Sequence, residues 1–233
     1  TGAASGRKEF GFQLDSYDLT RPLVIDPAML VYCGYIGGYY NDYGYDIAVD
    51  ETGMAYVVGS TASHGSSFPV VVGPDLTFNG DNFDVFVTKI KADGTGLDYC
   101  GYIGGTGSEW GKGIAVDESG AAYIAGWTSS SEDSFPVLVG PTLTYSEGSP
   151  YDTFVAKVKV DGTGLDYCGY IGGSDRDVAE GIAVDDKGAA YIVGYTSSSE
   201  SEGFPVTIGP DLTYNGADYR DDVFVAKIKP DGS

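Results

Sequence analysis

One heptapeptide occurs three times in this chain and limits what the chain can fold into. The sequence YCGYIGG stands at residues 32–38, 99–105 and 167–173, so the cysteines lie 67 and 68 residues apart. Most of the sequence between these copies also repeats in register. A fixed period of this size predicts an array of similar supersecondary units, none of which buries its apolar faces alone.

Each repeat reads as four short antiparallel strands, which suits a chain with 36 Gly and 19 Tyr. The first strand carries IAVD and is expected at residues 46–50, 113–117 and 181–185. An Asp-x-x-Gly turn follows it, because Asp bonds its own backbone and Gly takes a positive φ. The second strands are AYVVGST, AYIAGWT and AYIVGYT, and the third strands are DVFVTKIK, DTFVAKVK and DVFVAKIK. YCGYIGG supplies the fourth strand.

These strands divide the chain into predicted segments. Residues 1–28 form an N-terminal arm with a short strand at 9–14, and 29–105 hold the first recurring strand plus the first repeat. Residues 106–173 are the second repeat, and 174–233 are the third, which lacks a fourth strand. Between the second and third strands runs a long Ser-, Gly- and Pro-rich connection, expected to form a small hairpin or a protruding loop. A glycine inside each fourth strand is expected to mark a bulge or a close backbone approach: Gly34, Gly101 and Gly169.

Repeated four-stranded antiparallel sheets are the pattern of β-propeller blades. The combined motif IAVDxxGxAYIxGxTSS, FP and DxFVAKxxxDGxxLxYxxYIGG resembles the SBBP-type (seven-bladed β-propeller-type) repeat of bacterial and archaeal secreted and surface proteins, over about residues 29–232. The resemblance implies an all-β, propeller-type array of three four-stranded blades, with the first strand permuted to the N-terminus. It also implies an extracellular or cell-surface location and a structural or adhesive role, and it supplies no catalytic residue. The chain departs from the family in its fourth-strand Cys and its long connection.

Composition excludes some partners. The formal charge is −21, from 34 acidic and 13 basic residues, and such a surface repels nucleic-acid phosphates and anionic membranes. No apolar run approaches the ~20 residues of a membrane span. Because the three Cys hold equivalent repeat positions, they are expected to be buried free thiols rather than disulfides. The chain begins at Thr1 without Met, as expected of a mature or excised segment.

The two ends of the repeat array do not match. A fourth strand comes first, and the last repeat lacks one, which would expose the edge of its third strand. Either the leading strand completes the last repeat of another copy, giving a ring or filament, or the chain belongs to a longer protein with further repeats. The donated strand would comprise Met29, Leu30, Val31, Tyr32, Cys33, Gly34, Tyr35 and Ile36. The acceptor edge would comprise Asp222, Val223, Phe224, Val225, Ala226, Lys227, Ile228 and Lys229.

Acidic residues offer the strongest candidates for chemistry. Calcium could bind at the turn pairs Asp50/Glu51, Asp117/Glu118 and Asp185/Asp186, although Asp-x-x-Gly is also ordinary hairpin chemistry. The pairs Asp42/Asp46 and Asp175/Asp177 are weaker candidates, because they are not matched across the repeats. The single histidine, His64, is expected to be an exposed loop residue rather than part of a Ser-His-Asp triad. We therefore expect no catalytic residue and no cofactor, with calcium as the alternative.

Aromatic residues recur at the strand ends. Tyr43 and Trp110, with Val178 as their equivalent, precede the first strands, and Ser60, Trp127 and Tyr195 close the second strands. Packing between repeats is expected, with stacking on sugars as the alternative. Residues 128–131 and 196–199 are expected to be solvated loops, with O-glycan attachment as the alternative. The sequence thus predicts a non-enzymatic, self-assembling structural or adhesive module. The alternatives are a carbohydrate- or calcium-dependent recognition propeller and a fragment of a longer propeller.

Overall fold

A computed structural model describes residues 30–80, 82–216 and 220–233. The chain divides into two compact units, Thr1–Val31 and Tyr32–Ser233, and the fold described below belongs to the second. The predicted arm strand at residues 9–14 lies outside the described residues. No helix in the described part of the chain is both long and apolar enough to cross a bilayer.

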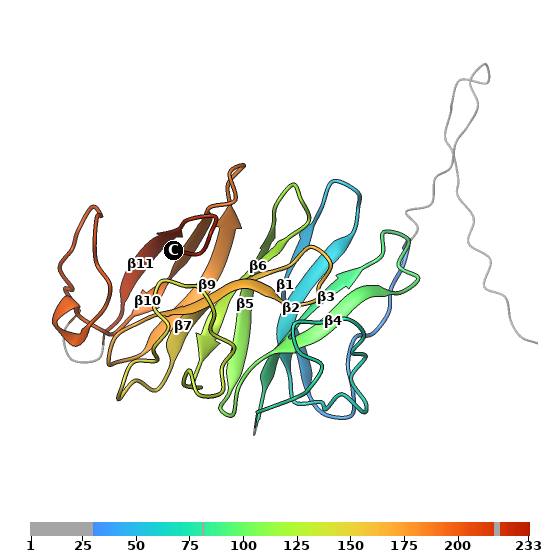
Figure 1. Ribbon diagram of the computed structural model, residues 1–233, viewed down its shortest axis with the longest axis horizontal. Coiled ribbons are helices and arrows are strands. Elements are labelled where there is room, and N and C mark those ends of the chain that lie inside the picture. Colours follow the sequence, from blue (N-terminus) through green and yellow to red (C-terminus); the bar gives the residue numbers. More distant parts are fainter. Residues whose placement is uncertain (1–29, 81, 217–219) are drawn as a thin grey trace, which may run out of the picture. The chain divides into compact units, whose positions relative to one another are not determined.

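The second unit is all-β, as predicted, and its strands form three antiparallel sheets (Figure 1). The first sheet contains β1 (Asp42–Val49), β2 (Ala55–Thr61), β3 (Asp84–Ile90) and β4 (Leu97–Ile103). The second contains β5 (Glu109–Val116), β6 (Ala122–Thr128), β7 (Asp152–Val158) and β8 (Leu165–Ile171). The third contains β9 (Asp177–Val184), β10 (Ala190–Thr196) and β11 (Asp222–Ile228), in the order β11-β10-β9. A short 3-10 helix, η1 (Glu200–Glu202), precedes β11.

The strand junctions follow the turn chemistry of the sequence. The last Gly of each Asp-x-x-Gly turn has a positive φ, at Gly53 (83°), Gly120 (86°) and Gly188 (80°). The first strands, however, begin four residues earlier than IAVD predicts. In each repeat a β-bulge interrupts the pairing between the first and second strands, and in β1 it lies between Gly44 and Asp46. The earlier residues that precede the bulge also pair with the second strand. The bulge breaks the alternation of side chains, so the sequence pattern does not show these residues as part of the strand.

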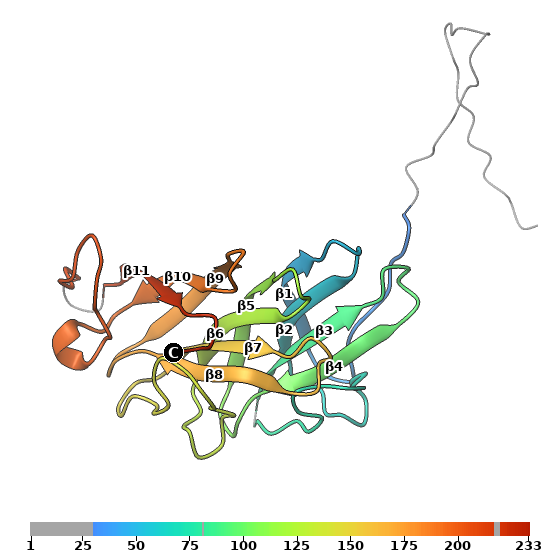
Figure 2. The same ribbon diagram turned by 45° about the horizontal axis from the view of Figure 1, so that its top comes forward.

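The long connection is neither a separate hairpin nor a free loop. In the first repeat it runs along the outer edge of β4: Val71 N–H donates to Cys100 O at 3.0 Å, and Cys100 N–H donates to Val72 O at 2.7 Å. Tyr102 N–H donates to Asp75 O at 2.8 Å. The second repeat does the same along β8, and Figure 2 shows both connections beneath these strands. Each connection therefore covers a strand edge that would otherwise be free.

The fourth-strand glycines lie where this covering chain passes. A Cβ on Gly101 would lie 2.5 Å from Gly73 Cα, and a Cβ on Gly169 would lie 2.7 Å from Gly140 Cα. The predicted close backbone approach is thus confirmed for both residues. Gly34 has nothing within 4 Å of such a Cβ, because no connection covers its segment among the described residues.

The core lies between successive sheets. Apolar side chains from the first sheet, such as Val58 and Val87, form one buried cluster with Ile114 and Ile124 of the second sheet. A second cluster joins the second and third sheets in the same way. The second sheet is therefore packed on both faces, which explains why its strands carry apolar residues on both sides.

The cysteines confirm one prediction and correct another. Cys100 and Cys168 are free and completely buried in the fourth strands, as predicted. Cys33 is free but exposed. It belongs to the segment expected as the first recurring strand, yet the described part of that segment, residues 30–36, forms no strand. The physical reason is that a strand needs a ladder partner, and none pairs with it among the described residues.

Candidate assembly interface

The third sheet ends in an open edge. In the first two sheets, the third strand lies between the second and fourth strands, whereas β11 pairs only with β10 in the described part of the chain. β11 ends at Ile228, so Lys229, the last residue of the predicted acceptor edge, lies beyond the observed strand. An unpaired β-strand edge presents a row of backbone donors and acceptors to another strand.

The outer face of the third sheet is open as well. Val223 and Val225 are 77% and 74% exposed, whereas their equivalents Val85 and Val87 in β3 are fully buried against the second sheet. At the opposite end of the array, the first sheet also exposes apolar side chains. Ile47 in β1 is 60% exposed, whereas its equivalent in β5 is buried. Each end thus exposes the apolar residues that an internal junction buries.

The connection of the third repeat has no strand to cover. In the first repeat, Val71, Val72 and Asp75 hold β4 by backbone hydrogen bonds. No such bond forms at the equivalent positions of the third repeat among the described residues, and Ile208 there is 97% exposed. By analogy with the first two repeats, an incoming fourth strand would therefore lie between the edge of β11 and residues 207–211, which are equivalent to the segment that holds β4. We call this position the acceptor slot.

An aromatic position in the slot is also unfilled. Phe68, Phe86 and Tyr102 pack together in the first repeat with ring centroids 5.3 and 5.6 Å apart. The second repeat contains an equivalent group with centroid distances of 5.4 and 5.6 Å. In the third repeat, Phe204 and Phe224 make the 5.3 Å contact, and the fourth-strand Tyr is missing among the described residues.

Segment 32–38 contacts the first sheet as a fourth strand contacts the sheet that follows it. The side chain of Tyr32 lies where a Cβ on Gly94 would stand. In the same way, the side chain of Tyr99 in β4 lies where a Cβ on Gly162 would stand, and that of Tyr167 in β8 lies where a Cβ on Gly232 would stand. The segment thus occupies the fourth-strand position of a sheet preceding the first.

The hydrogen bonds at the end of this segment repeat as well. Gly38 N–H donates to Asp42 Oδ2 at 2.7 Å, and Tyr40 N–H donates to Ser63 Oγ at 2.9 Å. The equivalent bonds in the next repeats are Gly105 to Glu109 (3.0 Å), Gly107 to Ser130 (2.7 Å), Gly173 to Asp177 (2.7 Å) and Asp175 to Ser198 (2.9 Å). Tyr35, the equivalent of buried Tyr102, is fully exposed. The segment is therefore anchored at its end and contacts the first sheet through Tyr32 and Ile36, whereas Cys33, Gly34 and Tyr35 are exposed.

Sequence reasoning missed two pairs of buried carboxyl groups at the internal junctions. Asp84 of β3 approaches Glu109 of β5, and Asp152 of β7 approaches Asp177 of β9. All four residues are completely buried. A Cβ on Gly172 would lie 2.7 Å from Asp152 Oδ1 and 3.0 Å from Asp177 Oδ2, so this glycine leaves room for both groups. The sequence does contain a signal for these pairs. Asp42, Glu109 and Asp177 occupy equivalent positions in the three repeats, so Asp42 and Asp177 are matched across the repeats.

Burial shifts the proton affinity of these groups. Desolvation raises the pKa of Asp84 to about 7, assisted by the nearby charge of Glu109. Desolvation likewise raises the pKa of Asp177 to about 7 and raises that of Asp152. Asp152 Oδ1 and Asp177 Oδ1 have no hydrogen-bond partner among the described residues, which further disfavours their charged forms.

These shifts predict that the free energy of unfolding falls as the pH rises from about 4 to about 7. A carboxyl whose pKa is raised in the folded state stabilises it below the unfolded pKa, and this contribution is lost as pH rises through the folded value. Denaturant titrations across this range should show a loss of up to about 4 kcal/mol per junction in the free energy of unfolding, because one pKa unit corresponds to about 1.4 kcal/mol. Asp177→Asn should flatten the profile and raise stability at pH 8. A variant as pH-dependent as the parent chain would contradict the assignment.

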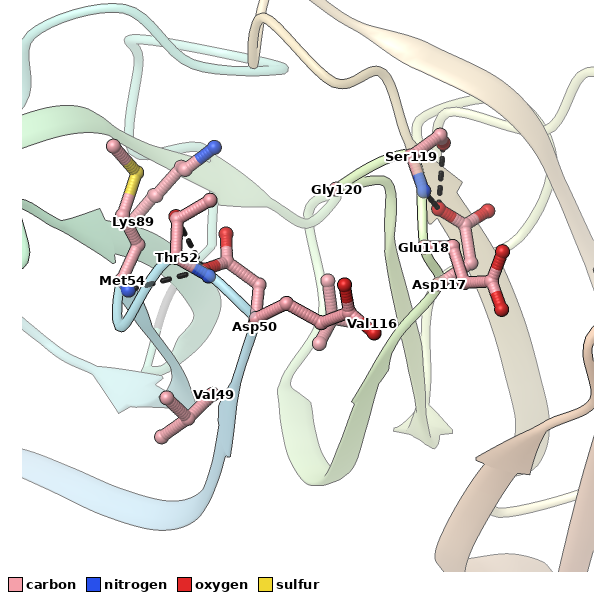
Figure 3. A pocket seen from close by; sticks show the side chains of 11 residues that line it. Val49, Asp50, Thr52, Met54, Lys89, Val116, Asp117, Glu118, Ser119 and Gly120 are labelled. Carbon is pink, nitrogen blue, oxygen red and sulfur yellow. Dashed lines mark hydrogen bonds between the residues drawn. The ribbon is translucent and has the colours of Figure 1, made fainter.

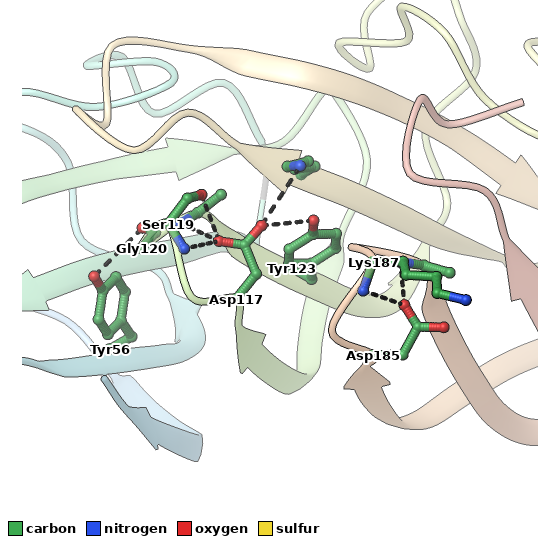
Figure 4. Close-up of polar contacts among 10 residues, drawn as sticks. Tyr56, Asp117, Ser119, Gly120, Tyr123, Asp185 and Lys187 are labelled. Atoms are coloured by element: carbon green, nitrogen blue, oxygen red, sulfur yellow. Dashed lines mark hydrogen bonds and ion pairs between the residues drawn. The ribbon is translucent and has the colours of Figure 1, made fainter. Parts of the chain in front are cut away.

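The acidic turns face a cavity of 430 Å³ between the first and second sheets (Figure 3). Asp50 does not point freely into this cavity, because its carboxylate accepts hydrogen bonds from Thr52, Met54 and Tyr56. Burial opposes ionisation of Asp50, yet these bonds hold its pKa below the usual value. The equivalent carboxylates of Asp117 and Asp185 are also bonded within their own turns (Figure 4).

The same turns bind neighbouring sheets together. Tyr56 Oη donates to Gly120 O of the next turn at 3.3 Å, as Figure 4 shows. Asp117 accepts a bond from Tyr123 at 2.8 Å and lies 3.6 Å from Lys157 Nζ. The described residues contain no group of three or more His, Cys, Asp or Glu side chains arranged to hold a metal ion. The turn carboxylates thus have structural partners at each position.

The strand-end aromatic residues stack on one another. Trp110 lies between Tyr43 and Trp127, with near-parallel rings at centroid distances of 6.2 and 5.8 Å. Tyr43 belongs to β1 and Trp110 to β5, so this contact joins the first and second sheets. Arg176 similarly covers Tyr195 at 5.3 Å. The ring faces are therefore engaged in packing between and within the repeats.

The remaining polar candidates occupy ordinary positions. His64 is exposed in its connection, as predicted, and its ring packs edge-on against Phe78. The expectation of solvated loops at 128–131 and 196–199 is wrong at alternate residues. Thr128 and Ser130 are buried, and both hydroxyls donate to Glu109 Oε1, which removes them as glycan acceptors in the folded chain.

Comparison with known proteins agrees with the repeated geometry. No curated protein sequence matches the chain. The model of a family described as beta-propeller repeat, SBBP, matches residues 32–65, 101–132 and 167–200. Each match begins at the first residue of a YCGYIGG copy or within it, and extends past the two strands that follow. The chain therefore contains three SBBP beta-propeller repeats.

Proposed function

We propose that this protein is a non-enzymatic structural module that assembles with copies of itself by exchanging a strand. Segment 30–36 of one copy enters the acceptor slot of another, and repetition of this contact builds a ring or a filament. The observation that carries the proposal is a match within the described part of the chain: residues 30–36 have a fourth-strand sequence but pair with no sheet there, and the third sheet has no fourth strand there.

The internal sheets define the register of the exchanged strand. In the first sheet Phe86 pairs with Tyr102 and Thr88 pairs with Cys100, and the second sheet repeats this register. Transferred to the slot, the pairs are Ile36 with Val223, Tyr35 with Phe224, Gly34 with Val225, Cys33 with Ala226 and Tyr32 with Lys227. Tyr35 then completes the aromatic group of Phe204 and Phe224.

The open faces support a second copy as the occupant. Val223 and Val225 correspond to residues that the second sheet covers in the first junction, and Ile47 corresponds to a residue that does the covering. Stacking a first sheet on a third sheet therefore recreates an internal junction. The same contact would join a further repeat of the family in a longer chain, and that arrangement predicts a monomer for the chain studied alone.

A structural role also agrees with how the acidic residues are used. Carboxylates at equivalent positions in successive repeats bind turns, hydroxyls and neighbouring strands, and none is set apart by a unique acid–base arrangement. An extracellular or cell-surface location belongs to the same proposal. It is supported by the acidic composition and by the resemblance of the repeat motif to that of secreted and surface proteins.

The proposal is tested by measuring mass and thiol accessibility together. Light scattering after size exclusion, from about 1 to 100 µM, should show oligomers that grow with concentration, as mass action requires. Cys33 should react with a maleimide in dilute samples and become protected in concentrated ones. Cys100 and Cys168 serve as internal controls, because they are buried in both states. A monodisperse monomer with a fully reactive Cys33 at every concentration would overturn the proposal.

A further inference from the structure

The proposed contact brings two carboxyl groups together, and they are the two that lack a partner at present. In each internal junction, the acidic residue at the start of a third strand meets the acidic residue at the start of the first strand of the next repeat. These pairs are Asp84 with Glu109 and Asp152 with Asp177. In the same series, Asp222 opens β11 and Asp42 opens β1. Joining the third sheet of one copy to the first sheet of another therefore places Asp222 beside Asp42.

Both groups are already held as members of such a pair. Asp222 Oδ2 accepts Asn215 N–H at 2.7 Å, and Asp84 Oδ2 accepts Asn79 N–H at 2.8 Å in the same position. In the first sheet, a Cβ on Gly37 would lie 2.7 Å from Asp42 Oδ2. Gly37 therefore leaves space beside this carboxylate, as its equivalent Gly172 does at an internal pair. The geometry of each half is therefore preformed.

Their surroundings differ from those of the internal pairs in one respect. Asp84, Glu109, Asp152 and Asp177 are fully buried, whereas Asp42 and Asp222 are partly exposed to water. Assembly would remove that water. Two carboxylates without water or a cation cannot both stay charged, so one proton must be bound or a counter-ion recruited.

The charged groups around the two carboxylates leave the proton as the balancing charge. Asp42 faces the hydroxyls of Thr61 and Ser63 and the phenol of Tyr102. Among the described residues, the acidic and phenolic groups near Asp222 are Tyr214, Asp221 and, through Asn215, Asp211. Of the nearby cations, Arg176 has its guanidinium bound to both oxygens of Asp221 at 2.8 Å, and Arg220, two residues before Asp222, is exposed to solvent.

We infer that assembly of this protein takes up a proton at each copy-to-copy junction, shared between Asp222 of one copy and Asp42 of the next. This inference depends on the proposed strand exchange and adds its regulation: acidification tightens the assembly and alkalinisation loosens it. The internal pairs, in which desolvation raises the pKa of Asp84 and Asp177 to about 7, place the transition near neutral pH.

The test is the dissociation constant of the full chain from sedimentation equilibrium between pH 5.5 and 8.5, at constant ionic strength. We expect the constant to weaken by up to about tenfold per pH unit above the transition, as uptake of one proton requires. Asp222→Asn should assemble about tenfold or more tightly than the parent chain at pH 8, with a flat profile. Asp42→Asn should give the same flattening from the other side of the junction.

Asp98→Asn separates this effect from general charge repulsion. It removes the same charge from an exposed position on β4 and should keep the parent slope. Assembly with equal slopes in the parent chain, Asp222→Asn and Asp42→Asn would overturn the inference while leaving strand exchange intact. Failure of the parent chain to assemble at any pH would overturn the proposed function itself.

Discussion

Replacing Tyr35 with Asp is expected to abolish assembly at micromolar concentration and to leave the folded monomer unchanged. Tyr35 is fully exposed in the single chain, so the substitution removes no intramolecular packing. Its equivalent Tyr102 is fully buried, and Tyr102 Oη donates to Ser63 O at 2.9 Å. In the assembly, the substituted carboxylate would have to enter the equivalent apolar position beside Phe204, without a hydrogen-bond or ionic partner.

The size of this effect follows from the chemistry of the position. Buried aromatic residues at the centre of an interface typically contribute about 2–4 kcal/mol, and a buried unpaired charge adds a further cost. We therefore expect the dissociation constant to rise at least about 100-fold. Sedimentation velocity and a thermal melt, recorded on the same samples, separate the loss of assembly from a loss of folding.

Tyr39→Asp is the matched control. Tyr39 is a neighbouring exposed tyrosine that lies beyond the strand register, so its replacement carries the same change of charge and volume without entering the slot. It should leave the dissociation constant within about threefold of the parent value. Equal weakening by both substitutions would indicate a general charge effect and would count against the slot.

Much of the fold follows from the repeated sequence because repetition exposes local rules. The Asp-x-x-Gly turns, with Gly53 in the positive-φ region, lie where turn chemistry predicts. The second and third strands also begin where predicted, because they are nearly continuous apolar runs bounded by Gly- or Pro-containing turns. The first strands start earlier because the bulge near Gly44 breaks that alternation.

What sequence reasoning missed depends on contacts between distant segments. The connection looked like a loop, because nothing local in residues 70–75 states that their backbone bonds to Cys100 and Tyr102. The pairing of the junction carboxyl groups could not be predicted for a similar reason, since Asp84 and Glu109 belong to different sheets and meet only after these sheets pack together. Segment 30–36 has a strand sequence but no strand, because a ladder requires a partner that the described chain does not supply.

The central claim also predicts a specific covalent bond between copies. In the first sheet Thr88 pairs directly with Cys100, and in the second Ala156 pairs with Cys168, so the exchanged strand should place Cys33 opposite Ala226. Directly paired antiparallel residues have Cα atoms about 4.5–5.5 Å apart, within the range that a disulfide spans. Cys100 and Cys168 are buried and should not compete.

The most direct measurement is therefore oxidation of the Ala226→Cys variant, followed by non-reducing electrophoresis. The strand register predicts a ladder of covalent oligomers that forms readily, disappears on reduction, and is lost when Cys33→Ser is added. Val225→Cys, one residue out of register and with its side chain on the opposite face, should cross-link far less. A ladder equally strong with Val225→Cys, or an Ala226→Cys chain that stays monomeric under oxidation, would contradict strand exchange.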